Sequence, residues 1–137
     1  TLLTKLSGED QSSSAALSPL IESAISIIQE EFPYLEGLDE LSQRLEISKA
    51  HLIRSFMKKT GVSPGKYLTR VRIEYAKLLL QDEDASVTYA AEASGFANAN
   101  YFAKVFRKET GMSPSEYLET IPRRKAPLRG PERGPLL

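Results

Sequence analysis

The stretch His51–Leu68, which reads HLIRSFMKKTGVSPGKYL, occurs a second time along the chain as Tyr101–Leu118, YFAKVFRKETGMSPSEYL. Eight of the 18 aligned positions are identical. The identical pairs are Phe56/Phe106, Lys58/Lys108, Thr60/Thr110, Gly61/Gly111, Ser63/Ser113, Pro64/Pro114, Tyr67/Tyr117 and Leu68/Leu118. An internal repeat of this kind indicates two similar supersecondary units in one body. The alternative that the repeat leaves open is a plain helical hairpin used twice for packing.

Each copy of the repeat carries the signals of a helix, a corner and a second helix. Gly61 and Gly111 follow basic residues and can adopt the left-handed conformation that ends a helix. Ser63 and Ser113 come next, each followed by proline, which is favoured at the first helical position behind a serine N-cap. In the second copy, Glu116 completes a capping box with Ser113. The Thr-Gly-x-Ser-Pro segment is therefore predicted to be a rigid corner between two helices.

The composition of the 137 residues excludes several kinds of protein. Cysteine is absent, which rules out disulfides, thiolate metal sites and a cysteine nucleophile. No apolar run approaches the roughly 20 residues of a membrane span, and no signal peptide is visible, so we expect a cytoplasmic protein without membrane contact. The only histidine, His51, has no cysteine or clustered carboxylates around it, so we expect no metal, no cofactor and no catalysis. Because the chain does not begin with Met, further sequence is expected before Thr1.

The charges are unevenly distributed along the chain, although the formal net charge is zero. Residues 9–46 contain nine acidic side chains and one basic side chain, whereas residues 48–79 contain eight basic and one acidic. Residues 82–120 are again acidic, and the chain from Ile121 onward is basic. A phosphate backbone responds to such a local basic field and not to the total charge, so nucleic acid stays a candidate partner.

Apolar periodicity and capping signals predict an all-α fold of seven helices. The predicted helices cover residues 19–31, 38–45, 49–60, 64–80, 87–94, 98–110 and 114–121, the first behind an N-cap at Ser18. Residues 1–17 are predicted to be a linker or disordered lead-in, and residues 122–137, rich in Pro, Gly and Arg, a disordered basic tail. Residues 38–60 thus read as helix, short turn, helix, and residues 87–110 repeat that pattern.

The second helix of each pattern has one apolar face and one face left for solvent or a ligand. Leu52 and Phe56 share the inward face of the first, as Phe102 and Phe106 do in the second. The outward positions are Ala50, Ile53, Arg54 and Met57 in the first helix, and Asn100, Ala103, Lys104 and Arg107 in the second. We expect the inward face to pack on the preceding helix and the outward face to be free to enter a groove.

The second copy has the more specific sequence pattern. It runs through Ser86-Val87, Ala91, Gly95-Phe96, Tyr101-Phe102, Val105-Phe106-Arg107-Lys108, Thr110-Gly111-Met112-Ser113-Pro114 and Tyr117. With these residues, the chain resembles the DNA-binding domain of AraC/XylS-type transcription regulators over about Leu20 to Ile121. The resemblance implies one domain, residues 18–121, with two helix-turn-helix units at about 18–63 and 86–121. The long helix 64–80 would link them.

In that family the second helix of each unit reads DNA, and the two helices occupy successive major-groove segments, about 34 Å apart. The resemblance implies base-edge contacts by Ala50, Ile53, Arg54, Asn100, Tyr101, Ala103 and Lys104. Phosphate contacts are expected from Ser48, Lys49, His51, Lys58, Asn98, Arg107 and Lys108. Arg54 can bond a guanine edge bidentately, and Asn100 can read adenine, whereas Ala50 and Ile53 can only pack. Two departures from the family are Lys104, where Arg is frequent, and Met57, where a basic residue is frequent.

The function predicted from these residues is sequence-specific duplex DNA binding by the output domain of a bacterial transcription regulator. RNA polymerase is an expected partner, and an effector-sensing and dimerisation domain is expected before Thr1. We assign the regulator as an activator as a working hypothesis, although no residue in the sequence distinguishes activation from repression. The alternative is a protein-interaction module with weak or lost DNA reading, suggested by the apolar Ala50, Ile53 and Met57. An enzyme is not predicted, because the methyl-accepting chemistry of related DNA-repair domains needs cysteine.

Overall fold

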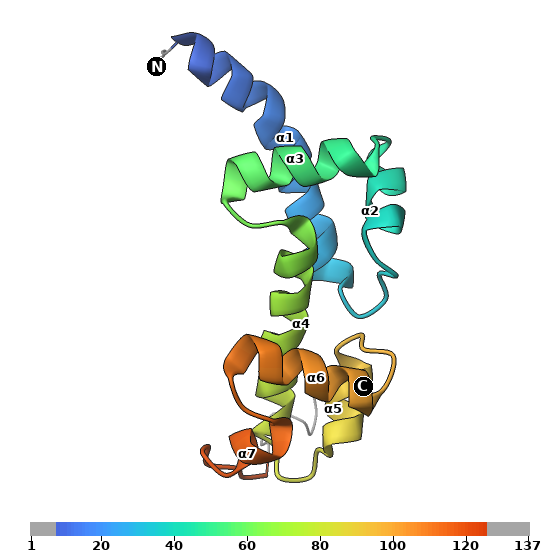
Figure 1. Ribbon diagram of the computed structural model, residues 1–137, viewed down its shortest axis with the longest axis vertical. Coiled ribbons are helices and arrows are strands. Elements are labelled where there is room, and N and C mark those ends of the chain that lie inside the picture. Colours follow the sequence, from blue (N-terminus) through green and yellow to red (C-terminus); the bar gives the residue numbers. More distant parts are fainter. Residues whose placement is uncertain (1–7, 126–137) are drawn as a thin grey trace. The chain divides into compact units, whose positions relative to one another are not determined.

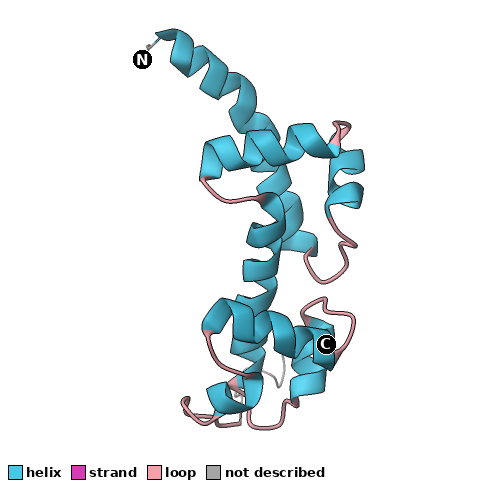
Figure 2. Cartoon of the chain, in the orientation of Figure 1, coloured by secondary structure: helices cyan, strands magenta, loops and turns pink. Residues whose placement is uncertain are grey.

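The computed structural model describes the backbone of residues 8–125 and the side chains of residues 19–125. Within this range the chain is helical, as Figures 1 and 2 show, and an isolated bridge between Asp82 and Arg124 is its only β-type pairing. The helices are α1 (Gly8–Glu31), α2 (Leu38–Leu45), α3 (Lys49–Thr60), α4 (Pro64–Leu80), α5 (Val87–Ala93), α6 (Ala99–Thr110) and α7 (Pro114–Leu118). The predicted all-α fold of seven helices with two helix-turn-helix units is confirmed. The chain forms two compact units, with unit 1 ending at Val71 and unit 2 beginning at Arg72.

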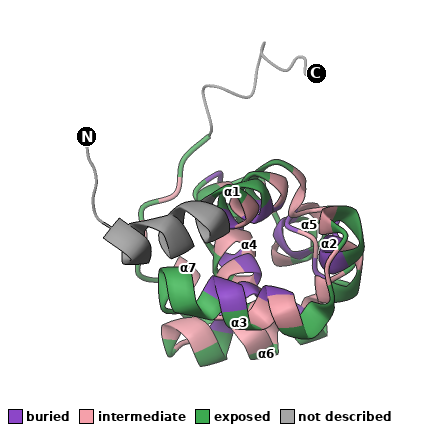
Figure 3. Ribbon diagram, turned by 90° about the horizontal axis from the view of Figure 1, so that it is seen from above, coloured by how far each residue is buried: buried purple, intermediate pink, exposed green. Residues whose placement is uncertain are grey.

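Unit 1 is held together by one apolar cluster, and Figure 3 colours its buried residues purple. The cluster consists of Ile21, Ala24, Ile28, Leu35, Leu41, Leu52, Phe56 and Leu68. Leu52 and Phe56 are fully buried, as the inward face of α3 predicts. The tight turn before α3 places Glu46 in the left-handed conformation, with φ 62°. The small side chain of Ser42 is buried beside this turn, where its hydroxyl donates to the Asp39 carbonyl oxygen at 3.0 Å.

Unit 2 repeats this plan with an aromatic core. Its buried residues are Ile73, Ala76, Leu80, Ala90, Ala91, Phe96, Phe102 and Phe106. The Phe102 ring lies 5.1 Å from Phe96 and 5.4 Å from Phe106, measured between centroids, and Phe106 lies 5.3 Å from Tyr117. Such tilted and edge-on pairs add to the stabilisation from buried area. These aromatic residues therefore serve packing, as the inward positions of Phe102 and Phe106 predict.

The corners after α3 and α6 have matching hydrogen-bond geometry. Thr60 Oγ1 donates to Phe56 O at 2.8 Å, and Thr110 Oγ1 donates to Phe106 O at 2.8 Å. Gly61 and Gly111 have φ values of 83° and 88°, and the N–H of each donates 2.8 Å to the carbonyl four residues earlier. The repeat in sequence is thus a repeat in backbone structure, and the predicted rigid corner is confirmed.

Helix α1 begins earlier than predicted. Residues 8–17, expected to belong to a linker or disordered lead-in, form the first turns of α1, and residues 1–7 lie outside the described range. Pro19, predicted at the first helical position behind a Ser18 cap, lies inside the helix instead. Proline removes a single N–H donor, and the Ala15-Ala16-Leu17 run before it favours helix, so the helix continues through this position.

The start of the predicted disordered tail is folded onto unit 2. Arg123 donates through Nε to Leu80 O at 2.8 Å and through Nη2 to Asp82 O and Ala85 O at 2.9 and 2.7 Å. The backbone of Arg124 donates to Gln81 O at 3.1 Å and accepts from Glu83 N–H at 3.1 Å. Residues 122–125 are therefore not the disordered segment that their Pro- and Arg-rich composition suggests, because these contacts satisfy carbonyl groups at the end of α4. Residues 126–137 lie outside the described range.

Candidate nucleic-acid interface

Helix α3 is fixed at both ends and along one face. The Ser48 side chain caps its N-terminus by accepting from His51 N–H at 3.0 Å, and Gly61 ends it in the left-handed conformation. Leu52 and Phe56 bury its inward face. The opposite face is therefore held in a defined orientation without contributing to the core.

The outward face of α3 presents the side chains that the sequence assigns to base reading. Ala50 and Arg54 are exposed, and Ile53 is half-buried. No hydrogen bond or ion pair engages the Arg54 side chain in the part of the chain that the structure describes. Met57, one turn beyond Ile53, is 46% exposed, which is high for an apolar side chain. The face thus combines one available guanidinium with apolar surface.

The predicted phosphate contacts around α3 differ in their availability. Lys49 Nζ lies 3.1 Å from Asp39 Oδ1 in an exposed ion pair, so part of its charge is compensated within unit 1. His51 Nε2 lies 3.5 Å from Ser55 Oγ, and the ring is half-buried. Lys58 is exposed near the end of the helix without a partner in the described range. Of this group, Lys58 offers the least compensated charge.

Helix α6 is positioned by the same devices. It begins at Ala99, one residue later than predicted, because Asn98 is its N-cap and accepts from Tyr101 N–H at 2.8 Å. The amide oxygen of Asn98 is therefore already used, and only its NH₂ is left for a phosphate. Asn100 and Lys104 are exposed, whereas Ala103 is half-buried.

Tyr101 has a defined place at the start of α6. Its ring packs 6.1 Å from that of Phe96 at an angle of 55°, yet the side chain is 56% exposed. Arg72, on α4, lies close enough for the phenol to affect it electrostatically. Burial lowers the pKa of the Arg72 guanidinium from its ordinary value, and Tyr101 opposes that change. In the sequence, Arg72 is only one of the basic residues of the stretch 48–79, and nothing near it indicates this neighbour.

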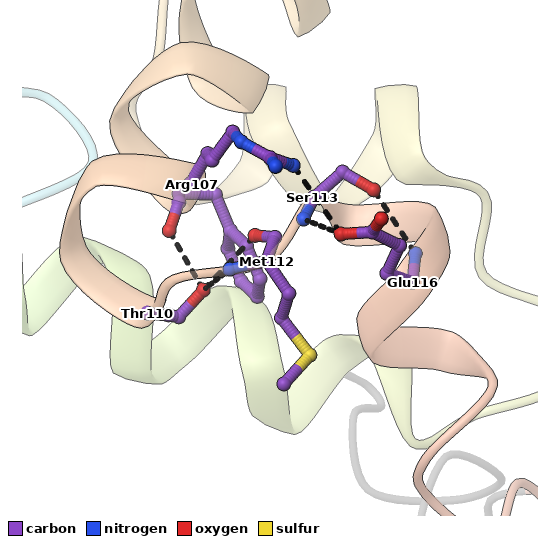
Figure 4. Close-up of polar contacts among 6 residues, drawn as sticks. Arg107, Thr110, Met112, Ser113 and Glu116 are labelled. Carbon is purple, nitrogen blue, oxygen red and sulfur yellow. Dashed lines mark hydrogen bonds and ion pairs between the residues drawn. The ribbon is translucent and has the colours of Figure 1, made fainter.

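Arg107 is joined to the next helix, as Figure 4 shows. Its Nη1 lies 3.3 Å from Glu116 Oε1, and that oxygen also accepts from Ser113 N–H at 2.8 Å. The Ser113 hydroxyl accepts in turn from Glu116 N–H at 3.1 Å, which completes the predicted capping box. The bond from Ser113 N–H and the nearby Arg107 hold the pKa of the Glu116 carboxyl below its usual value. Glu116, which the sequence pattern indicates only as part of a capping box, is therefore also a neighbour of this face.

Two other kinds of site can be checked among the described residues, a metal site and a membrane span. No group of three or more His, Asp or Glu side chains is placed to hold a metal ion within that range. None of the helices described has the length and hydropathy needed to cross a membrane. The candidate faces belong to two capped helices, α3 and α6, that each present small, polar and basic side chains away from a packed core.

Comparison with known proteins identifies the fold. Residues 41–120 match the family model described as a helix-turn-helix domain, and that range runs from within α2 to just after α7. The activator RhaS of Escherichia fergusonii is 35% identical over 98 residues, which make up 72% of this chain. The chain belongs to the AraC/XylS-type helix-turn-helix family. It is a sequence-specific DNA-binding domain of a transcription regulator and not an enzyme.

Two solved structures of bacterial regulators resemble this chain over most of their own length. The C-terminal domain of AraT, a response regulator from Geobacillus stearothermophilus, matches with a TM-score of 0.71 and 31% identity, over 77% of this chain and 88% of that domain. The DNA-binding domain of AdpA, solved in complex with a target DNA, matches with a TM-score of 0.67 and 26% identity, over 73% and 90%. By contrast, the chain spans only about a third of RhaS, 34% of its length.

Proposed function

We propose that α3 and α6 are the two reading helices of this AraC/XylS-type domain, entering successive major-groove segments of one duplex. The observation that carries the proposal is the repeated design of the two helices. Each helix begins after a side-chain N-cap and ends at a left-handed glycine. One face of each is buried, by a Leu-Phe pair in α3 and by a pair of Phe residues in α6. A helix of this kind presents its outward residues at a fixed angle, which base reading in the major groove requires.

The chemistry of the outward side chains supports a different role for each helix. On α3, Arg54 would bond the O6 and N7 atoms of a guanine, while Ala50 and Ile53 pack against thymine methyl groups. On α6, Asn100 would read adenine, and Lys104 would donate to a base edge without the bidentate geometry of arginine. Tyr101 and Ala103 would complete the apolar contact of α6 with the groove wall.

The remaining candidates would bind the phosphates on either side of the groove. Lys58 and Lys108 are exposed and without partners in the described range, so they are the strongest of this group. Ser48, Lys49, His51 and Asn98 surround the N-termini of the two helices, where the helix dipole also favours an anion. Arg107 is the weakest candidate, because Glu116 already compensates its charge.

The test is a selection of duplexes from a random pool by this chain, followed by titration of the best duplex over a range of salt concentrations. Two reading helices predict a consensus with two conserved segments about one helical turn apart, and an affinity that falls steeply with salt. A consensus confined to one segment would contradict the two-helix proposal.

A protein-interaction role is the second candidate, and the exposed Met57 beside the half-buried Ile53 is the observation that favours it. In that case no duplex from the pool would be enriched, and binding to any duplex would be weak and independent of sequence. Selection thus separates the two candidates.

For the regulator to which this domain would belong, we propose a bacterial cytoplasmic transcription activator that contacts RNA polymerase. RhaS is named as an activator, which supports this proposal. This chain spans about a third of the length of RhaS, which supports our further proposal of an effector-sensing and dimerisation domain in the same regulator. Transcription from a promoter that carries the selected site, with and without the full-length regulator, tests the direction of control.

A further inference from the structure

The helix that follows the reading helix is much shorter in unit 2 than in unit 1. After the corner at Gly61, α4 extends for 17 residues, and Leu68 in its second turn is buried in the core of unit 1. After the corner at Gly111, α7 has five residues, and Leu118, the residue equivalent to Leu68, is only half-buried. The chain after α6 is therefore anchored less firmly by its own helix than the chain after α3.

The C-terminal strap, as we name residues 122–125, provides a second anchor for unit 2. Arg123 is half-buried. Its guanidinium donates at 2.7–2.9 Å to the carbonyl oxygens of Leu80, Asp82 and Ala85. Hydrogen bonds from a charged donor are roughly twice as strong as neutral ones. The strap therefore fixes the connector between α4 and α5 to the chain that follows α7.

The strap reaches the point where the second helix-turn-helix begins. Ala85 directly precedes Ser86, the side-chain N-cap of α5. Ala91 of α5 is fully buried, and its carbonyl oxygen accepts from Phe96 N–H at 3.0 Å in the turn into α6. The Phe96 ring in turn packs 5.1 Å from Phe102, on the inward face of α6. Because a packed core leaves its side chains little freedom, the position of Ala85 affects the position of α6 through α5.

The other end of α6 leads back to the same strap. Phe106 packs 5.3 Å from Tyr117 of α7, measured between ring centroids. Thr120 N–H donates to Tyr117 O at 2.9 Å, and Arg123 follows three residues later. Helices α5, α6 and α7 lie around the second half of α4 (Figure 1), and the hydrogen bonds of Arg123 close the chain from Leu80 onward into a ring. The reading helix of unit 2 is thus tied to Arg123 from both of its ends.

We propose that Arg123 is a positioning residue for DNA reading by α6. The proposal goes beyond the proposed function but rests on it, because α6 must enter the major groove. Arg123 acts through Ala85 and α5 and not by touching the duplex. A binding constellation needs its side chains held to within about 0.5 Å, so a looser connector weakens base contacts. Phosphate contacts carry no sequence information, and those of unit 1 do not depend on Arg123.

The test compares Arg123→Ala with the unmodified chain and with Arg124→Ala, a control whose side chain is exposed. The probes are the selected duplex and two copies of it, each with one of the two conserved segments replaced by mixed sequence. The segment in which Arg54→Ala relaxes discrimination is that of α3, and the other segment is that of α6. Titrations are made at a temperature at which circular dichroism shows each variant to be fully folded.

The expected result is a loss of sequence preference in one segment only. Arg123→Ala should lower the preference for the selected α6 segment by about tenfold, which corresponds to the loss of roughly one base contact. The preference for the α3 segment should stay the same, and Arg124→Ala should change neither. A merely structural role would leave both preferences unchanged in a folded chain. That outcome, or an equal loss in both segments, would overturn the proposal.

Arg123→Lys decides the matter if Arg123→Ala does not fold. Lysine keeps the charge but lacks the fork of donors that reaches three carbonyls, so this variant should fold and still lose part of the α6 preference. A lysine variant that does not fold, or one that keeps the full preference, would overturn the proposal. Failure of the proposed function is distinguishable, because the unmodified chain would then show no preference in a second segment before any substitution.

Discussion

Arg123 closes unit 2 by donating through Nε to the carbonyl oxygen of Leu80, 43 residues earlier, at 2.8 Å. Its Nη2 reaches two further carbonyls, those of Asp82 and Ala85, so that one side chain holds both the end of α4 and the connector to α5. The last carbonyls of a helix have no partner within the helix, and a cationic side chain is a favourable one. The connector that leads into the second helix-turn-helix is thus tied to the chain after α7.

Removing this side chain should destabilise unit 2 specifically. Hydrogen bonds from a charged group contribute more than neutral ones, so Arg123→Ala should lower the free energy of unfolding of unit 2 by about 2 kcal/mol. Urea denaturation followed by circular dichroism measures the loss, and amide hydrogen exchange in α5 and α6 locates it. Arg124→Ala is the matched control, because Arg124 makes its contacts through the backbone and its side chain is exposed. Equal stability of the two variants would contradict the prediction.

The corner glycines are required for their backbone conformation alone. A methyl group at Gly61 or Gly111 would meet nothing within 4 Å, yet φ is +83° and +88° at these positions. Gly61→Ala and Gly111→Ala should therefore each cost about 1–2 kcal/mol, the strain of a left-handed non-glycine residue. Thermal unfolding measures the cost.

Gly65 provides the control for that prediction. It lies in α4, and an added methyl group would make only an ordinary contact with Leu38 Cδ1 at 3.7 Å. Gly65→Ala should leave the stability unchanged or raise it by about 0.5 kcal/mol, because alanine is the better helix former. An equal loss of stability in all three variants would contradict backbone strain as the cause.

What the sequence predicted well was local. The helix order, the N-caps at Ser63 and Ser113 and the left-handed glycines follow from neighbours a few residues apart, and the structure confirms them. The buried faces of α3 and α6 follow from helical periodicity, so the outward faces could be assigned before any coordinates.

What the sequence did not predict depends on residues far apart in the chain. The composition around Arg123 is that of a disordered tail, and nothing near it in sequence indicates the carbonyls of α4 that it binds. The helical start of α1 was missed because Ser18-Pro19 is a strong local start signal, which an established helix can override. The ion pair of Lys49 with Asp39 and the burial of Arg72 likewise arise only once the helices pack.

Arg54 should be the residue whose loss most relaxes sequence preference. Arg54→Ala removes the one arginine of the outward face of α3 and should cost about 1–3 kcal/mol against the selected duplex, with discrimination lost at one base pair. Lys59→Ala is the control, because Lys59 is an exposed cation of the same helix. Around the helix axis, its side chain is rotated by more than a third of a turn from that of Arg54. Titration of duplexes substituted at each position measures both. An Arg54→Ala variant that lost affinity equally for all duplexes would make Arg54 a phosphate contact instead.

The Glu116 carboxyl should make unit 2 sensitive to acid. Its pKa in the folded chain is lowered from the ordinary 4.5, first by the hydrogen bond from Ser113 N–H and then by Arg107. A lowered folded pKa means that the stabilisation is fully present above the unfolded pKa and is lost as the pH falls through the folded value. Glu116→Gln should therefore lower the melting temperature at pH 7, and the difference from the unmodified chain should shrink as the pH falls below about 4.5. Glu92→Gln is the control, since Glu92 is exposed and its side chain has no partner in the described range. A difference between Glu116→Gln and the unmodified chain that is the same at pH 7 and pH 3 would show that the charge of Glu116 does not contribute.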